Sequence, residues 1–533
     1  MLLPQILAAA EPPPPPDPAE TPVRDFLKGR VEFPQFVFAG PQFPTATFVP
    51  ADAAQQFPGP HRVVARFFDR DGKEVREAAD PGPYAAVVEL VPEKGRTTRR
   101  LVTLFREAKP ADSAGKFDAE QPAPFANWSG LSPAVLKRQS ELIAATCKNR
   151  SIAELARDPK VARLLAGLTL SPADSAPPRK NADAFAQERQ WWVDLKRTLA
   201  GTPAPATPLL IPSPRSGPPA PVVREGTLAE AGMKPDTAEK IDAALQVYAA
   251  DTDQAFAVCV VRRGVIVIHK AYGTRDGRPM TLTDKSWMAS VTKTMSATLM
   301  MMLVDRGLAS LDDPITKFLP QFRGLENSAP ITLRHLYTHT SGLAEWPSWS
   351  DELADMEDQV ADAYPFVQAG KKWAYSGQGY TLGGKIIEAL SGEAIPAFYL
   401  RHMLQPLGMD HTDVIATHAD AMTAPLDMAR FAQMLLNLGS YGDLEFFRPE
   451  TFDAMLPKVL TDVLGPEATK TFGIGLDGQP GSGKFGHGTA SAATFHIDAN
   501  EQLVTIMCRN KIGTNYDKYH GKFHEAIAAG IIR

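Results

Sequence analysis

The amino-acid sequence predicts an α+β protein: an antiparallel sheet flanked by helices, with a helical subdomain, preceded by a small β-rich module and a short helical segment. Three observations lead to this class. Strand-like apolar runs lie near both ends of residues 226–533, and the stretch between them has helical periodicity. Two proline-rich stretches divide the chain. Short apolar runs separated by Gly, Pro and Asp fill residues 30–107.

Length and composition support several packed units. A chain of 533 residues exceeds what one hydrophobic core usually organises, and 44% hydrophobic with 22% charged residues is typical of globular proteins. The net charge of -5 and the lack of a long basic run argue against nucleic acid or an anionic membrane surface as partner. No stretch reaches the roughly 18 apolar residues of a membrane span. We therefore expect no transmembrane segment.

Residues 1–29 combine a short apolar start, MLLPQILAAAE, with a proline run at 11–22. The apolar and small residues favour an export signal, and so a periplasmic or extracellular location over a cytoplasmic one, although a basic n-region is missing and Pro4 interrupts the stretch. The proline run holds the backbone extended. It predicts a tether.

The next 200 residues change character twice. Residues 30–120 are predicted to form the β-rich module, because the runs PQFVFAG, HRVVARFF, YAAVVELV and RRLVTLF are separated by turn-forming residues. Residues 121–200 have helical spacing of apolar positions and predict two or three helices. Residues 201–225 are proline-rich again and predict an extended linker, so that 226–533 form the last domain.

The last domain begins and ends with the same kinds of element. It is predicted to open with a helix at 234–250 and two strands, 255–261 and 265–272, joined at Arg263-Gly264. After a helical middle it closes with strands at 492–497 and 502–508 and a helix at 520–531. The glycine-rich stretch 472–486 has no complete phosphate-binding pattern and is interpreted as a flexible loop. Strands from both ends are expected to share one sheet.

The three cysteines are too few for a disulfide framework. Cys259 and Cys508 lie in apolar runs, where a small buried core residue is the expected role. A disulfide between these two strands stays open at this point. None of the three cysteines is expected to be catalytic.

The motif with most chemical content is Ser290-Val-Thr-Lys293. A spacing of three places both side chains on one face of a helix, where the lysine nitrogen can reach the hydroxyl. A serine alcohol is a weak nucleophile until a neighbour removes its proton, so this spacing suits nucleophilic catalysis. Taken alone, the pattern also fits a helix-starting serine followed by an exposed lysine.

Two further triplets follow in order, Tyr375-Ser376-Gly377 and His487-Gly488-Thr489. With Ser290 to Lys293 they resemble the S-x-x-K, Y-x-N and K/H-T-G-like motifs of penicillin-binding proteins, class C β-lactamases and related esterases and D-amino-acid peptidases. Segments 303–320, 331–343, 372–392 and 424–439 are also similar to that family. The resemblance covers nearly all of 226–533 and implies a β-lactamase/transpeptidase-like fold. Residues 1–225 show no resemblance.

The resemblance implies acyl transfer without a cofactor. Ser290 would attack a carbonyl to form an acyl-enzyme, with Lys293 and Tyr375 sharing the proton transfers. A neighbouring Lys293 cation would favour the Tyr375 phenolate or shorten the proton path; which of the two is the base stays open. The backbone N–H groups of Ser290 and Ala490 would form the oxyanion hole. His335 and His339 resemble a bracing stretch of the family and receive no catalytic role.

Two departures from the family pattern concern the substrate. Gly377 stands where the family has Asn and offers no amide to the substrate or to Lys293. In the third triplet Gly488 and Thr489 exchange the usual order, and a one-residue shift along a strand turns a side chain to the other face. Recognition of a carboxylate is therefore weakened, although His487 could still donate to an anionic or polar group.

The sequence thus predicts a serine hydrolase for a small-molecule or peptidoglycan-like substrate, with esterase favoured over D-Ala-D-Ala carboxypeptidase or β-lactamase. The catalytic residues would be Ser290, Lys293 and Tyr375, and His487, Gly488 and Thr489 would lie at the substrate. No H-E-x-x-H or C-x-x-C pattern predicts a metal site. The alternative from another class is a non-catalytic binding or scaffolding protein with a decayed site. The oligomeric state is not predicted.

Overall fold

The structure is a computed structural model of the 533-residue chain. It describes residues 30–33, 37–38, 40–49, 61–69, 73–80, 82–92, 98–106, 209, 211–319, 322, 327–345, 360, 364, 367–414 and 416–533. The helices expected within 121–200 and the tether expected within 1–29 lie outside these residues.

The described part of residues 30–106 is built from strands. A five-stranded sheet has the order β2-β7-β6-β4-β5, and β1 pairs with β3 in a separate ribbon. Tyr84, Ala86 and Val88 alternate along β6 and are buried, as expected for a strand with one face on a core. Phe43 stacks on Phe67 with ring centroids 4.1 Å apart. The strands are β1 (Arg30–Glu32), β2 (Val37–Phe38), β3 (Thr47–Val49), β4 (His61–Phe68), β5 (Glu74–Val75), β6 (Gly82–Pro92) and β7 (Thr98–Arg106).

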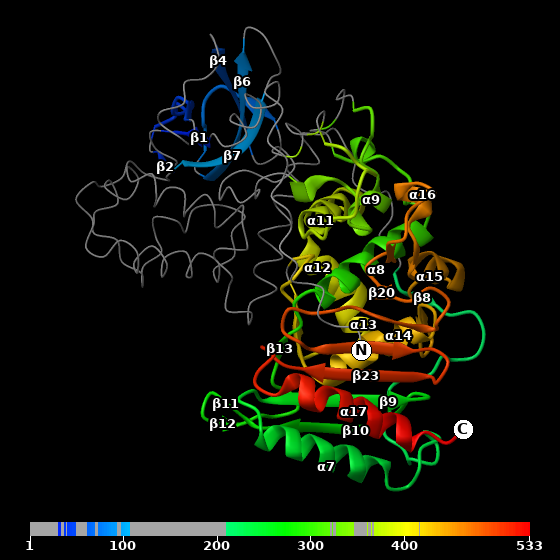
Figure 1. The fold of residues 1–533 in the computed structure, drawn as a ribbon. Coiled ribbons are helices and arrows are strands. Elements are labelled where there is room, and N and C mark those ends of the chain that lie inside the picture. Colours follow the sequence, from blue (N-terminus) through cyan, green and yellow to red (C-terminus); the bar gives the residue numbers. More distant parts are fainter. Residues whose placement is uncertain are drawn as a thin grey trace.

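A six-stranded antiparallel sheet forms the frame of the C-terminal domain (Figure 1), with the order β10-β9-β23-β22-β21-β20. Strands from the beginning and the end of the domain are neighbours, since β9 pairs with β23. The turn between β9 and β10 has positive φ at Arg263 and Gly264, the conformation of a tight hairpin. The strands are β9 (Phe256–Arg262), β10 (Val265–Tyr272), β20 (Asp477–Gly478), β21 (Lys484–Gly486), β22 (Thr494–Asp498) and β23 (Leu503–Cys508).

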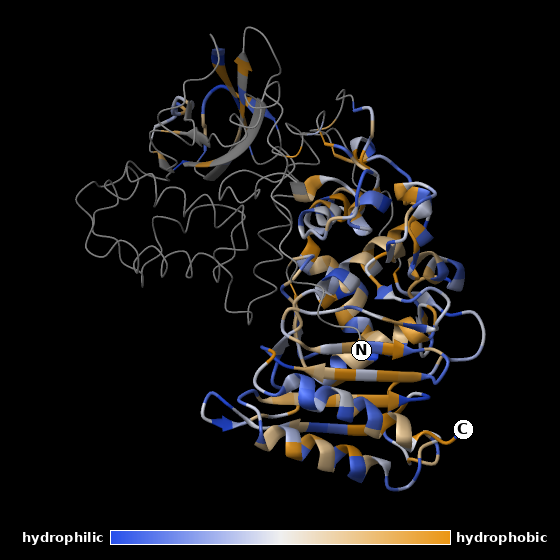
Figure 2. Ribbon diagram, viewed as in Figure 1, coloured by the Kyte–Doolittle hydropathy of each residue, from blue (hydrophilic) through white to orange (hydrophobic). Residues whose placement is uncertain are grey.

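Helices cover both faces of this sheet because both faces are apolar. Along β9, Phe256 and Val258 pack with helices α7 (Thr237–Ala250) and α17 (Tyr516–Gly530). Cys259 and Val261 belong to the core on the other face, which includes helix α14 (Pro425–Leu436). Figure 2 shows the hydrophobic strands between outer helices of mixed character. The result is three layers, with the sheet in the middle.

Between β10 and β20 the chain is largely helical. Helix α8 (Val291–Asp305) is buried from Val291 to Leu303, which marks it as a core helix rather than an amphipathic surface helix. Around it lie α9 (Leu333–Tyr337), α11 (Gln378–Ser391), α12 (Ile395–Tyr399), the π-helical turn Leu400–Leu404, α13 (Gln405–Leu407), α15 (Pro449–Met455) and α16 (Thr461–Leu464). Short strands include β11 (Thr274–Arg275), β12 (Arg278–Pro279), β13 (Ser286–Trp287), β14 (Thr412–Asp413), β15 (Met422–Thr423), β16 (Ser440–Tyr441), β17 (Leu444–Glu445), β18 (Lys458–Val459) and β19 (Thr471–Phe472).

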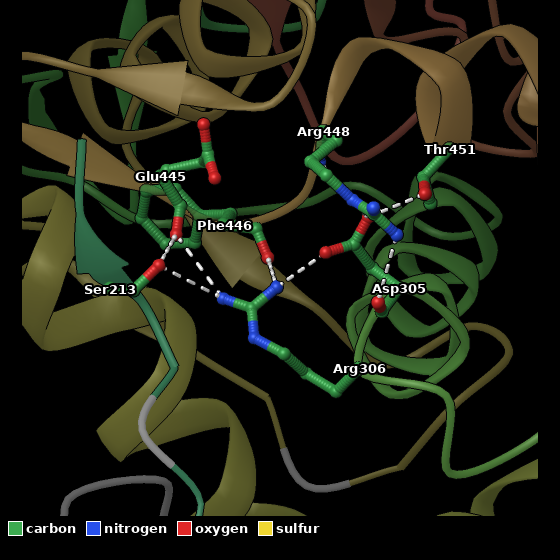
Figure 3. Close-up of polar contacts among 7 residues, drawn as sticks. All are labelled: Ser213, Asp305, Arg306, Glu445, Phe446, Arg448 and Thr451. Carbon is green, nitrogen blue, oxygen red and sulfur yellow. Dashed lines mark hydrogen bonds and ion pairs between the residues drawn. The ribbon is translucent and has the colours of Figure 1, made fainter. Parts of the chain in front are cut away.

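The end of the proline-rich stretch pairs with and hydrogen-bonds to the C-terminal domain. Strand β8 (Ser213–Pro214) pairs with β17. Arg306, just after α8, donates to the Ser213 hydroxyl at 3.3 Å and pairs with Asp305 at 2.6 Å (Figure 3). Asp305 also accepts from Thr451 at 2.5 Å and Arg448 at 3.1 Å. The last residues before 226 therefore make specific contacts with the domain that follows.

The structure confirms the α+β class, with an antiparallel sheet, flanking helices and a helical subdomain. Strand β10 has the predicted bounds, and α17 begins four residues earlier than expected. The flexible loop expected at 472–486 is wrong, because this stretch contributes β20 and β21 to the sheet. Cys259 and Cys508 are buried free thiols, so they form no disulfide. Among the described residues, no helix has the length and apolar character needed to cross a membrane.

Candidate active site

Ser290 stands at the N-terminus of helix α8, as its N-cap residue. The preceding Ala289 has φ 44°, in the left-handed region that costs energy for a residue with a Cβ. This backbone is held by Thr292, whose hydroxyl donates to the Ala289 carbonyl at 2.6 Å and accepts from the Ala421 N–H at 2.9 Å. The helix start thus gives Ser290 a fixed position and the positive end of the helix dipole.

Lys293 lies one turn into the same helix, with only 2% of its surface exposed. Its Nζ is 3.4 Å from the Ser290 Oγ and donates to the His418 carbonyl at 2.8 Å. The same nitrogen lies 4.9 Å from the centre of the Tyr375 ring and 5.8 Å from that of Tyr380. Burial disfavours the charged ammonium and lowers the pKa of Lys293 to about 8. A sizeable fraction of the amine is therefore neutral near physiological pH.

Tyr375 approaches from the segment before α11. Its hydroxyl lies close enough to the Ser290 side chain for that side chain to affect the pKa of Tyr375. The ring keeps 46% of its surface exposed, yet burial around the hydroxyl raises the pKa of Tyr375, and the Ser290 side chain only partly offsets this. The phenolate that a Lys293 cation was expected to favour is thus disfavoured.

His339 braces the second motif, as expected from the sequence. Its carbonyl accepts from the Ala374 N–H at 2.9 Å, and its Nδ1 accepts from the Ser376 N–H at 3.1 Å. His339 has φ 60° and is 2% exposed. These contacts fix the backbone on both sides of Tyr375. His335 lies elsewhere, in the capping box at the start of α9.

The third triplet follows directly after β21. The His487 ring centre lies 6.3 Å from that of Tyr375. Its Nδ1 donates to the Gly488 carbonyl at 2.6 Å, which leaves Nε2 as the acceptor nitrogen. Nε2 is buried and has no hydrogen-bond partner within the described residues. Burial lowers the pKa of His487 to about 4, so the ring is neutral at pH 7.

The two residues after His487 differ in their surroundings. A Cβ added at Gly488 would meet no atom within 4 Å, so this position borders open space. The Thr489 hydroxyl donates to the Ala493 carbonyl at 3.2 Å and is used inside its own turn. The N–H groups of Ser290 and Ala490 donate no hydrogen bond within the described part of the chain. Both N–H groups are available to another acceptor.

One neighbour of this group was missed from the sequence. His418 lies in the loop between β14 and β15, and a Cβ added at Gly377 would come within 2.8 Å of its Cδ2. Burial and then Lys293 lower the pKa of His418 to about 4. Gly377 in the second motif indicated that a side chain is missing at this point, but the sequence did not show that His418 fills the space.

The described residues contain no group of three or more His, Cys, Asp or Glu side chains arranged to hold a metal ion. What the structure brings together is a serine hydroxyl, a buried amine, a phenol and three neutral imidazoles, those of His339, His418 and His487. Such a set can move protons and present a nucleophile.

The chain is similar to a known family and to several known proteins. The family model described as Beta-lactamase matches residues 249–529, more than half of the chain. Esterase EstB of Burkholderia gladioli is 30% identical over 266 residues, covering 45% of this chain and 67% of that protein. Penicillin-binding protein 4* of Bacillus subtilis is 28% identical over 171 residues, covering 30% of this chain and only 37% of that protein.

Solved structures match as well. The hydrolase EstCE1, described as having promiscuous acyltransferase activity, superposes with a TM-score of 0.46 and 18% identity, covering 56% of this chain and all of that one. FmtA from Staphylococcus aureus superposes with a TM-score of 0.45 and 19% identity, covering 60% of this chain and 93% of that one.

Proposed function

Since the chain belongs to the beta-lactamase family, we propose that it is a serine hydrolase that cleaves uncharged esters through an acyl-enzyme on Ser290. The observation that carries the proposal is the 3.4 Å contact between the Ser290 hydroxyl and the buried Lys293 amine. A nucleophile within reach of a base is what covalent catalysis requires.

Lys293 is the base in this proposal and Tyr375 the proton carrier. Lys293 has a pKa near 8, close to the working pH where a general base is most effective. Tyr375 has a pKa raised above its usual value of 10, so the phenol keeps its proton and can donate it. This division of roles uses the opposite directions in which burial moves the pKa values of an amine and a phenol.

The reaction begins with acylation of Ser290. The neutral Lys293 amine takes the Ser290 proton while Oγ bonds to the ester carbonyl carbon. The carbonyl oxygen becomes an oxyanion that the N–H groups of Ser290 and Ala490 bind. The oxyanion then re-forms the carbonyl as the bond from the carbonyl carbon to the alcohol oxygen breaks, while Tyr375 gives its proton to that oxygen and regains one from the Lys293 ammonium. In the second half of the reaction, water takes the place of Ser290 as the nucleophile: Lys293 removes its proton as its oxygen bonds to the acyl carbon. Tyr375 then returns a proton to the Ser290 Oγ as the acyl bond breaks, and the acid is released.

The choice of an uncharged ester rests on the third triplet. A carboxylate-bearing substrate needs a cation or hydroxyl there. His487 is neutral, its buried Nε2 is an acceptor, Gly488 has no side chain, and the Thr489 hydroxyl is bonded to Ala493. The third triplet therefore offers a substrate carboxylate neither a cation nor a free hydroxyl, and an uncharged ester does not need one. Esterase EstB among the relatives supports the same direction.

The test is hydrolysis of p-nitrophenyl butyrate beside nitrocefin, with wild type and Ser290→Ala, together with fluorophosphonate labelling. The proposal expects ester turnover and labelling by wild type and neither by Ser290→Ala. Turnover of nitrocefin comparable to that of the ester would contradict the specificity argument. Equal ester hydrolysis by both proteins would exclude Ser290 as nucleophile, and silence of both would favour a binding protein with a decayed site.

A further inference from the structure

Gly377 and His418 occupy one space between them. Gly377 has φ -77° and ψ -26° as the N-cap of α11, a conformation open to any residue. Steric strain of the backbone therefore does not explain the glycine. A side chain there would meet His418, since an added Cβ would lie 2.8 Å from Cδ2, 3.2 Å from Cγ and 3.5 Å from Nε2. The imidazole stands where a side chain of residue 377 would begin.

His418 is held in place by several elements. Its Nδ1 lies 3.3 Å from the Thr381 hydroxyl of α11. On one side of it, the Thr417 carbonyl accepts from Ser296 of α8 at 2.6 Å. On the other side, the Ala419 carbonyl accepts from the Trp287 indole of β13 at 2.5 Å. The loop therefore presents the imidazole in a defined position rather than as a mobile side chain.

The same residue touches the amine of the catalytic group. The His418 carbonyl accepts from Lys293 Nζ at 2.8 Å, and the ring is close enough for Lys293 to affect its pKa. His418 is half-buried, whereas Lys293 is 2% exposed. The His418 backbone thus contacts the buried amine directly, and its partly exposed ring lies near it.

We propose that the His418 imidazole replaces a side chain of residue 377 as the wall that shields the Lys293 amine from water, which makes His418 a positioning residue of the hydrolase. This inference rests on the proposed function, because it concerns the base of that reaction. Without the imidazole, water reaches Lys293 and stabilises the ammonium, so the ammonium is harder to deprotonate and less of the neutral amine is present to act as the base.

Other titratable groups also face the Lys293 amine. The titratable groups facing the amine are Tyr375 and Tyr380 from the second motif and α11, His339 from the loop after α9, His487 after β21, and His418. Burial is what lowers the pKa of Lys293. Shielding from water, rather than a neighbouring charge, is therefore the property to test.

The experiment measures kcat/KM for p-nitrophenyl butyrate between pH 6 and pH 10 in the full chain. Wild type should gain activity as pH rises through about 8. In His418→Ala this rise should move up by about one pH unit, so that activity falls roughly tenfold at pH 7 and largely recovers near pH 10. Gly377→Asn should move the rise in the same direction, because the new side chain and the imidazole clash and neither can fill the space in an ordered way.

The double variant Gly377→Asn/His418→Ala refills the space from the other side. Its pH profile should move back toward that of wild type, a non-additive result that two independent losses would not give. His411→Ala is the matched control, since the His411 side chain is exposed and its contact with Asp427 is made by the backbone N–H. Its profile should equal that of wild type.

The outcomes separate the two proposals. If Ser290-dependent activity is present but the profile of His418→Ala does not move, the shielding role is wrong and the proposed function stands. If wild type has no Ser290-dependent activity, the proposed function fails and this inference with it. Thermal unfolding identifies variants that do not fold. His418→Asn is the second variant, with a shift in the same direction expected and an unmoved profile again contradicting the proposal.

Discussion

Replacing Lys293 by methionine should abolish activity and, at neutral pH, stabilise the protein. The native structure buries an amine whose pKa falls from 10.5 to about 8, and a change of that size corresponds to about 3 kcal/mol against the charged form at pH 7. Methionine has similar length and no charge. It loses the bond to the His418 carbonyl, which costs about 1 kcal/mol. We expect Lys293→Met to raise the free energy of unfolding by about 1 to 2 kcal/mol.

The stability gained by Lys293→Met should depend on pH. The folded-state pKa of Lys293 is lower than the unfolded value, so between pH 8 and pH 10.5 the unfolded chain binds more protons than the folded one. The stability of wild type therefore rises across this window, while below pH 8 the cost is constant. The advantage of Lys293→Met should be full at pH 7 and should shrink toward pH 10.5.

Urea unfolding followed by tryptophan fluorescence, to which Trp287 and Trp373 contribute, measures this at pH 7 and pH 9.5. Lys484→Met is the control, because the Lys484 side chain is 69% exposed and bonds only weakly to Asp498 at 3.4 Å; it should change stability by less than about 0.5 kcal/mol at either pH. Equal destabilisation of Lys293→Met at both pH values would refute the reasoning, since it would mean that the buried amine has no desolvation cost.

Three further predictions concern other residues. Tyr375→Phe removes the proton carrier and should lower kcat for p-nitrophenyl butyrate by about 100-fold with little change in KM; a kcat within twofold of wild type would contradict the role. Asp305→Ala leaves Arg306 and Arg448 without the buried carboxylate that they and Thr451 share, and should cost about 3 kcal/mol in urea unfolding, with an unchanged midpoint as the contrary result. Gly488→Thr enters open space and should leave the thermal midpoint and ester turnover within experimental error, whereas a large loss of either would mean that the space is needed.

Much of the fold could be predicted because it follows local patterns. The continuous apolar run of β9, which is buried on both faces, and the Arg263-Gly264 turn are encoded in adjacent residues. The error at 472–486 has a different origin. Glycines in this stretch suggest flexibility, but the short strands β20 and β21 form because β22 supplies a partner for hydrogen bonding. Pairing with a segment further along the chain is not visible in local composition.

The site was predictable to the extent that its parts lie in motifs. Ser290 and Lys293 share a helix, so their contact follows from spacing, and the order of the motifs suggested Tyr375. Of the two roles that the sequence left open for Lys293 beside Tyr375, the stabilised phenolate is disfavoured, because the pKa of Tyr375 depends on how much water reaches the hydroxyl, which only the packed structure determines. His418 could not be predicted, since it belongs to no motif and meets Gly377 through the fold alone.

The two glycines that depart from the family pattern therefore have different structural consequences, although each replaces a polar residue of that pattern. At Gly488 the missing side chain leaves open space and removes a polar contact, which changes what can bind. At Gly377 the space is taken by His418, which would keep water away from the base. Exchanging the residue at 488 should change the acceptance of carboxylate-bearing substrates relative to uncharged esters at a constant pH profile, and exchanging the residue at 377 should change the pH profile first. Substitutions at residues 488 and 377 thus test substrate recognition and proton transfer separately.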